Sequence, residues 1–303
     1  MGIEPFKPSD SAAVLQLHED AFQELDFSSF LWEPCQQIES LEKDCVRHVY
    51  RDEAVKGYGA AYSLDETHFR LNLLVGPRHA RRGIGSLLLD LIEMEVRKLG
   101  GKYLQARLQE SMSESLAFAL SRGFVFVHRM RGMSLRAEDF SYEKWKPLGE
   151  RLFEEGFSAT TFKDEEEVGN TPLEKLARLQ RRAREGWPLP DPTWKLDATT
   201  QQAREPFTHI SVPERFSIMK FKDEYVGYTS AEDGNGSVGT GVHPLYRGRG
   251  VATYLKAFDI QRCIVAGKEY FESASANPAM LKVNEKLGYK FNELTEVRFV
   301  KYL

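Results

Sequence analysis

Val242-His-Pro-Leu-Tyr-Arg-Gly-Arg-Gly-Val-Ala252 joins a strand-like segment to one whose apolar residues recur at helical spacing. Gly248 and Gly250 allow the backbone to turn tightly and leave no Cβ in the way of a ligand. The start of a helix offers an anion unpaired N–H groups and a positive dipole end. Arg247 and Arg249 add charge-assisted contacts. The stretch therefore predicts a turn that binds a pyrophosphate.

The same pattern occurs earlier in the chain, in Val75-Gly-Pro-Arg-His-Ala-Arg-Arg-Gly-Ile-Gly85. In both stretches a proline follows the strand-like run, and a glycine, an apolar residue and a tiny residue come after it in the same order. A helix-like segment follows each turn and ends at Gly100 or Gly267, which are helix stop signals. Each copy then carries a Gly-aromatic pair, Gly123-Phe124 or Gly288-Tyr289. This ordered series indicates an internal duplication.

The segments that surround the two turns predict a mixed α/β fold. The runs 69–75 and 238–242 are expected to be strands, and acidic turns within 51–58 and 222–228 each separate two further strand-like runs. Alternating strands and helices are typical of α/β domains. The buried faces of the two helices are predicted to comprise Ile84, Leu87, Leu88, Leu91, Ile92 and Leu99 in the first copy, and Val251, Leu255, Phe258, Ile264 and Val265 in the second.

The length of 303 residues is twice the commonest domain size, which favours two domains, assigned here to residues 1–146 and 147–303. A net charge of -4 gives no reason to expect a nucleic-acid partner. The three cysteines (Cys35, Cys45 and Cys263) form no C-x-x-C pair, which argues against a metal site and favours reduced thiols in the cytoplasm. No apolar run is long enough to span a membrane.

Two common phosphate-binding motifs are absent from these turns. A Walker A loop requires Gly-Lys-Ser/Thr, and a dinucleotide-binding fingerprint requires a third glycine that both copies lack. Arg247-x-x-Gly250-x-Ala252 instead resembles the R/Q-x-x-G-x-G/A acyl-CoA motif of the GNAT (GCN5-related N-acetyltransferase) superfamily. Asn277-Pro-Ala-Met-Leu-Lys-Val-Asn-Glu-Lys-Leu-Gly-Tyr289 resembles the second motif of that family. The resemblance covers the chain as two units, similar in layout to two-domain acetyltransferases of the mycothiol synthase type.

The resemblance implies two tandem GNAT-like domains, each with a mixed, mostly antiparallel sheet flanked by helices, and acetyl-CoA as the acetyl donor. Ala80, Met112 and Ala119 depart from the motif residues of the second copy, so the second half is expected to be the better cofactor site and the catalyst. The predicted cofactor-binding residues are Val242, Arg247, Gly248, Arg249, Gly250, Val251, Ala252, Asn277 and Asn284, and in the first half Val75, Arg81, Arg82, Gly83, Ile84 and Gly85.

The reaction implied by the resemblance is direct attack of a small-molecule amine on the thioester in a ternary complex. Glu232, Asp233 and His243 are the candidate general bases, and Glu272 is a weaker one. Asn284 stands where many family members have a tyrosine that protonates the thiolate, and an amide cannot serve as that acid. The alternative is a tandem GNAT pseudoenzyme that binds acyl-CoA or acts as a scaffold. The acidic run 164–167 is predicted to be a solvated face.

Overall fold

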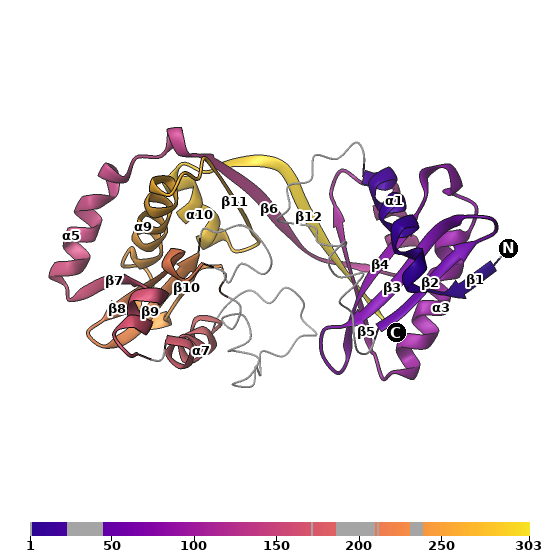
Figure 1. The fold of residues 1–303 in the computed structure, drawn as a ribbon, viewed down its shortest axis with the longest axis horizontal. Coiled ribbons are helices and arrows are strands. Elements are labelled where there is room, and N and C mark those ends of the chain that lie inside the picture. The colour runs from indigo at the N-terminus through magenta and orange to yellow at the C-terminus, as the bar shows by residue number, and fades with distance from the viewer. Residues whose placement is uncertain (1, 23–44, 171, 186–209, 211, 231–238) are drawn as a thin grey trace. The chain divides into compact units, whose positions relative to one another are not determined.

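The computed structural model describes residues 2–22, 45–170, 172–185, 210, 212–230 and 239–303. They form two compact units (Figure 1), of which the first comprises 1–129 and 295–303 and the second 130–294. These bounds differ from the sequence-based division at residue 146. The reason is that the strands β6 (Val125–Arg136) and β12 (Lys290–Tyr302) are each divided between the two units.

The first unit is built on a mixed, mostly antiparallel sheet in which β12, the last strand of the chain, pairs with β5. Neighbouring strands run antiparallel except for β4 and β5, which are parallel. The helices α1 (Ser11–Phe22), α3 (Ile84–Lys98) and α4 (Ser113–Ser121) flank the sheet. The strand order is β1 (Gly2–Pro5), β2 (Cys45–Arg51), β3 (Val55–Ser63), β4 (His68–Val75), β5 (Tyr103–Gln109) and then β12.

The second unit contains a four-stranded antiparallel sheet with the order β10-β9-β8-β7, and a further strand, β11, that pairs with β6 along 131–136. The strands are β7 (Phe157–Thr161), β8 (Phe216–Phe221), β9 (Glu224–Ser230), β10 (Gly241–Val242) and β11 (Tyr270–Ser275). The helices are α5 (Lys146–Glu154), α6 (Phe162–Glu167), α7 (Pro172–Ala183), α9 (Val251–Val265) and α10 (Pro278–Leu287). The predicted mixed architecture, with helices beginning after each glycine turn, is confirmed.

The duplication is visible in how each helix approaches its sheet. A Cβ added to Gly57 on β3 would lie 2.8 Å from Ile84 Cγ2, at the start of α3. A Cβ added to Gly227 on β9 would lie 3.0 Å from Val251 Cγ1, at the start of α9. In both units a strand glycine therefore permits the first residue of the helix after the turn to pack against the backbone of the sheet.

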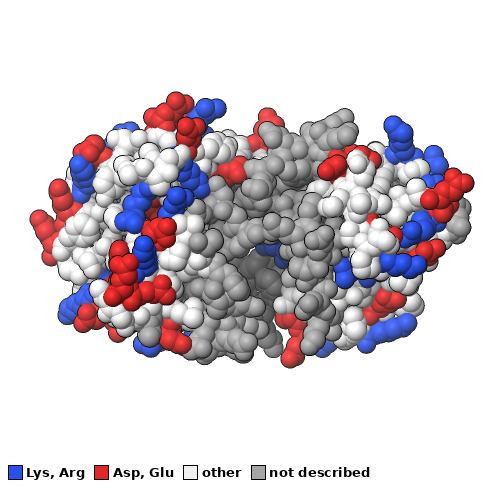
Figure 2. Space-filling view, viewed as in Figure 1, with Lys and Arg blue, Asp and Glu red and all other residues white. Residues whose placement is uncertain are grey.

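Charged side chains of both signs are interspersed on the visible surface (Figure 2), in keeping with the small net charge of -4. One acidic side chain departs from the prediction of a solvated face for 164–167. Glu165 is buried and accepts hydrogen bonds from Lys220 Nζ at 2.9 Å, Tyr225 Oη at 2.7 Å and Asn170 Nδ2 at 2.7 Å. None of the described helices is long and apolar enough to cross a membrane.

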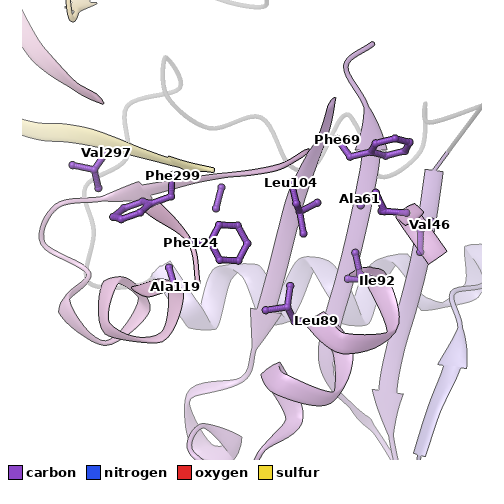
Figure 3. Close-up of a cluster of buried hydrophobic side chains, with 12 residues drawn as sticks. Val46, Ala61, Phe69, Leu89, Ile92, Leu104, Ala119, Phe124, Val297 and Phe299 are labelled. Carbon is purple, nitrogen blue, oxygen red and sulfur yellow. The ribbon is translucent and has the colours of Figure 1, made fainter. Parts of the chain in front are cut away.

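The main core of the first unit lies between α3, α4 and the sheet (Figure 3). Leu89 and Ile92 of α3 pack in one cluster with Phe69 of β4 and with Val297 and Phe299 of β12. The end of the chain thus supplies two side chains to the core of the first unit. Three residues predicted to lie on the buried helix faces are instead exposed, because they lie on the outer side or at the end of their helices: Leu87, Leu99 and Val265.

We expect Phe299→Ala to lower the free energy of unfolding of the first unit by about 3–5 kcal/mol, the usual cost of removing a buried aromatic side chain. Leu120→Ala is the control, since Leu120 lies on the surface of α4 in the same unit and should change stability by less than about 0.5 kcal/mol. Denaturant unfolding measures both variants. Equal effects of the two substitutions would contradict the placement of β12 in this core.

Candidate acyl-CoA site

The strands β4 and β5 pair over only part of their length. Parallel pairing joins His68–Arg70 to Tyr103–Gln105 and stops there. Beyond this point β4 continues to pair with β3 as far as Val75, and β5 continues to pair with β12 as far as Gln109. The edge of β4 that faces β5 is therefore left without strand partners from Leu71 onward in the described sheet.

A pocket of about 650 Å³ opens where the two strands part. Its volume lies in the range typical of small-molecule sites. One wall is formed by 71–75 of β4 and 106–108 of β5, and the other by the turn before α3 and by α4. All of its lining residues belong to the first unit. The pocket thus runs from the unpaired edge of β4 to the predicted anion-binding turn.

The turn itself has a backbone conformation suited to binding an anion. Arg81 and Gly83 are both left-handed, with φ of 61° and 84°. Helix α3 begins directly afterwards at Ile84, and its first intrahelical bond beyond the turn runs from Leu87 N to Gly83 O at 3.0 Å. The preceding N–H groups lack helical partners, and successive N–H groups in such a turn form an anion-binding concavity.

The second unit repeats this backbone geometry with different residues. Gly248 and Gly250 are left-handed, with φ of 78° and 93°, so Gly248 corresponds to Arg81 and Gly250 to Gly83. A side chain in the left-handed region costs roughly 1–2 kcal/mol. The first unit therefore holds Arg81 in a conformation that only glycine adopts without cost. Non-glycine residues in the left-handed region are found preferentially at functional sites.

The guanidinium of Arg247, a predicted pyrophosphate ligand, has backbone partners in the second unit. It donates to three backbone carbonyls: Val242 O at 3.2 Å, Glu185 O at 2.9 Å and Ala183 O at 2.7 Å. These contacts join the turn to β10 and to the end of α7. Arg247 is thus engaged by backbone carbonyls within the second unit.

Helix α5 lies against the same turn of the second unit. Arg151 Nη2 donates to Arg249 O at 2.7 Å, and a Cβ added to Gly250 would lie 2.8 Å from Leu148 Cδ1. The Arg249 guanidinium lies 3.9 Å from Glu155 Oε2. The backbone next to Gly250 therefore already has protein neighbours, whereas no described residue lies within 4 Å of a Cβ added to Gly83, apart from its neighbours in the chain.

The asparagines and the histidine predicted to act in the second unit have local structural partners. Asn277 caps α10 by accepting from Ala279 N at 3.0 Å, and His243 accepts from Leu245 N at 3.3 Å in the turn after β10. Asn284 is fully buried and its Nδ2 donates to Ser273 Oγ at 2.9 Å. Glu272 lies on β11. Glu232 and Asp233 lie outside the described residues.

In the first unit the structure brings most of the predicted residues together. Val75, Arg81, Gly83, Ile84 and Gly85 all line the pocket, whereas Arg82 is exposed beside it. Met112 and Ala119, the positions that depart from the family motif, also line it. Sequence reasoning missed Asn72 and Arg107, two polar residues of the pocket wall. The available signal was the alternation of polar residues along these strands, Arg70 and Asn72 in one and Gln105, Arg107 and Gln109 in the other.

Comparisons with known proteins agree with this architecture. Residues 11–124 match the Acetyltransferase (GNAT) family. A GCN5-related N-acetyltransferase from Sphaerobacter thermophilus aligns over 99% of this chain and 95% of its own at 18% identity, with a TM-score of 0.71. A tandem GNAT protein from the clavulanic acid biosynthesis pathway aligns over 99% and 98% at 19% identity, with a TM-score of 0.69. No curated protein matches the sequence.

A third structure is the GCN5-related glucosamine N-acetyltransferase region of a fungal multi-domain β-N-acetylglucosaminidase. It aligns over 98% of this chain and 38% of its own, at 15% identity and with a TM-score of 0.72. The chain therefore shares the fold of these proteins over almost its whole length. The family match covers residues 11–124, which lie in the first unit.

We expect Arg247→Ala to destabilise the second unit by about 2 kcal/mol, because it removes charge-assisted hydrogen bonds to three carbonyls. Arg249→Ala is the matched control in the same turn, since the Arg249 guanidinium is half-exposed and makes weak contacts, 3.9 Å to Glu155 Oε2 and 5.8 Å to the centroid of the Tyr246 ring. Denaturant unfolding compares the variants. Unchanged stability in Arg247→Ala, combined with weaker acetyl-CoA binding, would restore the role predicted from the sequence.

Proposed function

We propose that the protein transfers the acetyl group of acetyl-CoA to a primary amine of a small molecule, and that the first unit holds the acetyl-CoA. The observation that carries this proposal is the continuous pocket between the left-handed turn at Arg81–Gly83 and the unpaired edge of β4. The sequence had favoured the second unit, but there the side chain of Arg247 is engaged with backbone carbonyls.

The residues of the first unit fit two parts of acetyl-CoA, the pyrophosphate and the pantetheine arm. The N–H groups that follow Arg81 would bind the pyrophosphate, with the exposed side chains of Arg78 and Arg82 nearby to balance its charge. The free edge at 71–75 presents strand N–H and C=O groups that would pair with the amides of the pantetheine arm. A Cβ on Gly85 would make only ordinary contacts, 3.5 Å from Val75 Cγ2, in accord with Ala252 in the other copy.

Acetyl-CoA supplies the acetyl group as a thioester. The chain contributes by holding the amine and the donor in one cleft, where proximity replaces an encounter in solution. An unpaired backbone N–H of β4 is suited to stabilising negative charge on the carbonyl oxygen. Ala119 lines the pocket at the position of the family's tyrosine and has no proton to donate, so we propose that solvent protonates the departing thiolate.

The acceptor class is proposed on the same basis. The pocket volume of about 650 Å³ suits a small molecule together with the end of the pantetheine arm. One structural neighbour is described as a glucosamine N-acetyltransferase region and another as part of the clavulanic acid pathway. A small amine is compatible with both descriptions.

A thermal-shift titration with acetyl-CoA tests where the donor binds. Gly83, Gly100 and Gly248 all have φ between 78° and 86° and no atom within 4 Å of an added Cβ, so substitution by glutamate imposes similar strain at each position. Only Gly83 adjoins the pocket. We expect Gly83→Glu to lose the shift, whereas Gly100→Glu, at the other end of α3, and Gly248→Glu retain it.

The wild-type shift follows from mass action and corresponds to about 2.7 kcal/mol when the ligand is at 100 times its Kd. Loss of the shift in Gly248→Glu alone would place the donor in the second unit. A wild-type protein that shows no shift would remove acetyl-CoA as the donor. A subsequent assay of thiol release with amine acceptors measures transfer itself.

A further inference from the structure

Three arginines of the first unit lie on one face of its sheet. Side chains alternate between the two faces along a strand. Phe69, Ala106 and Phe299 pack in the core with α3. Their sequence neighbours Arg70, Arg107 and Arg298 therefore point to the opposite face.

The pairing of the strands brings these arginines close together. Arg107 lies directly opposite Arg298 in the β5–β12 register, and Arg70 lies opposite Gln105, two residues before Arg107 on β5. Like charges placed directly opposite each other destabilise a sheet. A fold that retains this arrangement needs a compensating negative charge.

Glu296 supplies only part of this compensation. Its carboxylate is buried and accepts a hydrogen bond from Arg298 Nε, while Arg107 Nε lies 3.9 Å from Glu296 Oε1, beyond hydrogen-bonding distance. Glu296 is therefore paired with Arg298 and does not accept a hydrogen bond from Arg107 Nε. In the part of the chain that the structure describes, Nε of Arg70 and Nε of Arg107 are buried without a hydrogen-bond partner.

The charges also affect one another. Burial, together with the charges of Arg70 and Arg298, lowers the pKa of Arg107 to about 9. Burial and the charge of Arg298 lower the pKa of Arg70. With a pKa of about 9, Arg107 remains protonated at neutral pH.

This arginine cluster (Arg70, Arg107 and Arg298) adjoins the acyl-CoA pocket. Arg107 and Asn72 both line the pocket where β4 and β5 part. Asn72 follows Arg70 by two residues on β4 and so shares its face. Among the residues that the structure describes, its buried Oδ1 has no hydrogen-bond partner. The pocket wall therefore combines anion-binding groups with an amide oxygen able to accept from an N–H donor.

We propose that the arginine cluster binds the carboxylate or phosphate of the acceptor, an amine that also carries an anionic group, with its amine beside Asn72. Guanidinium groups match the geometry of both anions through paired N–H donors. The proposal that the cluster binds an anion does not depend on the proposed function. The proposal that this anion belongs to an acetyl acceptor rests on the proposed acetyl transfer.

Anion binding is tested first, without acetyl-CoA, by thermal-shift titration with inorganic phosphate and with succinate. We expect the double variant R70Q/R107Q to raise the Kd for at least one of these anions by about 10-fold or more. Arg97→Gln, an exposed arginine of α3 in the same unit, should leave the Kd unchanged. Gly83→Glu should also retain binding, which separates the cluster from the turn.

Two further results would distinguish a binding cluster from a structural one. Without added anion, the double variant should melt no lower than wild type, because it removes mutual repulsion. Should it fail to fold, Arg107→Lys keeps the charge but loses the planar donor pair, and is expected to weaken anion binding several-fold. Unchanged binding in the folded arginine variants, or loss of all binding in Gly83→Glu, would overturn the proposal.

The acceptor is tested with matched amines and acetyl-CoA in the thiol-release assay. L-Alanine is compared with L-alaninamide for the carboxylate, and O-phosphoethanolamine with ethanolamine for the phosphate. In at least one pair the anionic member should show about 10- to 100-fold higher kcat/KM in wild type, and the double variant should lose this preference. Equal or higher kcat/KM with the neutral amines would exclude an anionic acceptor. Failure of acetyl-CoA to bind would contradict the proposed function, but the test of anion binding without acetyl-CoA would still apply.

Discussion

The structure of the first unit depends on one change of hydrogen-bonding partner, the end of β4–β5 pairing after Arg70. Up to that residue the two strands share a ladder, and beyond it each strand pairs only on its outer edge. A run of unpaired backbone groups inside a sheet is costly unless a ligand or solvent satisfies it. The pocket forms because the strands part there, and the turn at Arg81–Gly83 lies at the end of the β4 edge.

This parting requires β5 to be held from its other side. The end of the chain provides the support, because β12 pairs with β5 from Tyr103 to Gln109 and places Val297 and Phe299 in the core. Local sequence patterns predict strands but carry no information on which distant strand will pair with them. The sequence-based boundary at residue 146 could not anticipate this, since a single boundary assigns 295–303 to the second unit.

Local features were predicted well where one short segment determines them. Gly83, Gly100, Gly250 and Gly267 mark the ends of α3 and α9, because glycine conformational freedom acts within a single turn. The role of Arg247 could not be read in the same way, because its partners Ala183 and Glu185 are remote in sequence. The motif determined the position of that arginine but not the direction of its guanidinium.

The two turns show how a duplicated backbone can be kept while its use diverges. Both retain two left-handed residues before a helix, since the chain must reverse direction there for the helix to pack on a strand glycine, Gly57 or Gly227. That packing requirement acts equally in a binding and a non-binding copy. Conserved glycines at such a turn are therefore weak evidence for a ligand. The stronger evidence is Arg81, a non-glycine residue in the left-handed region that also lines the pocket, because such residues cluster at functional sites.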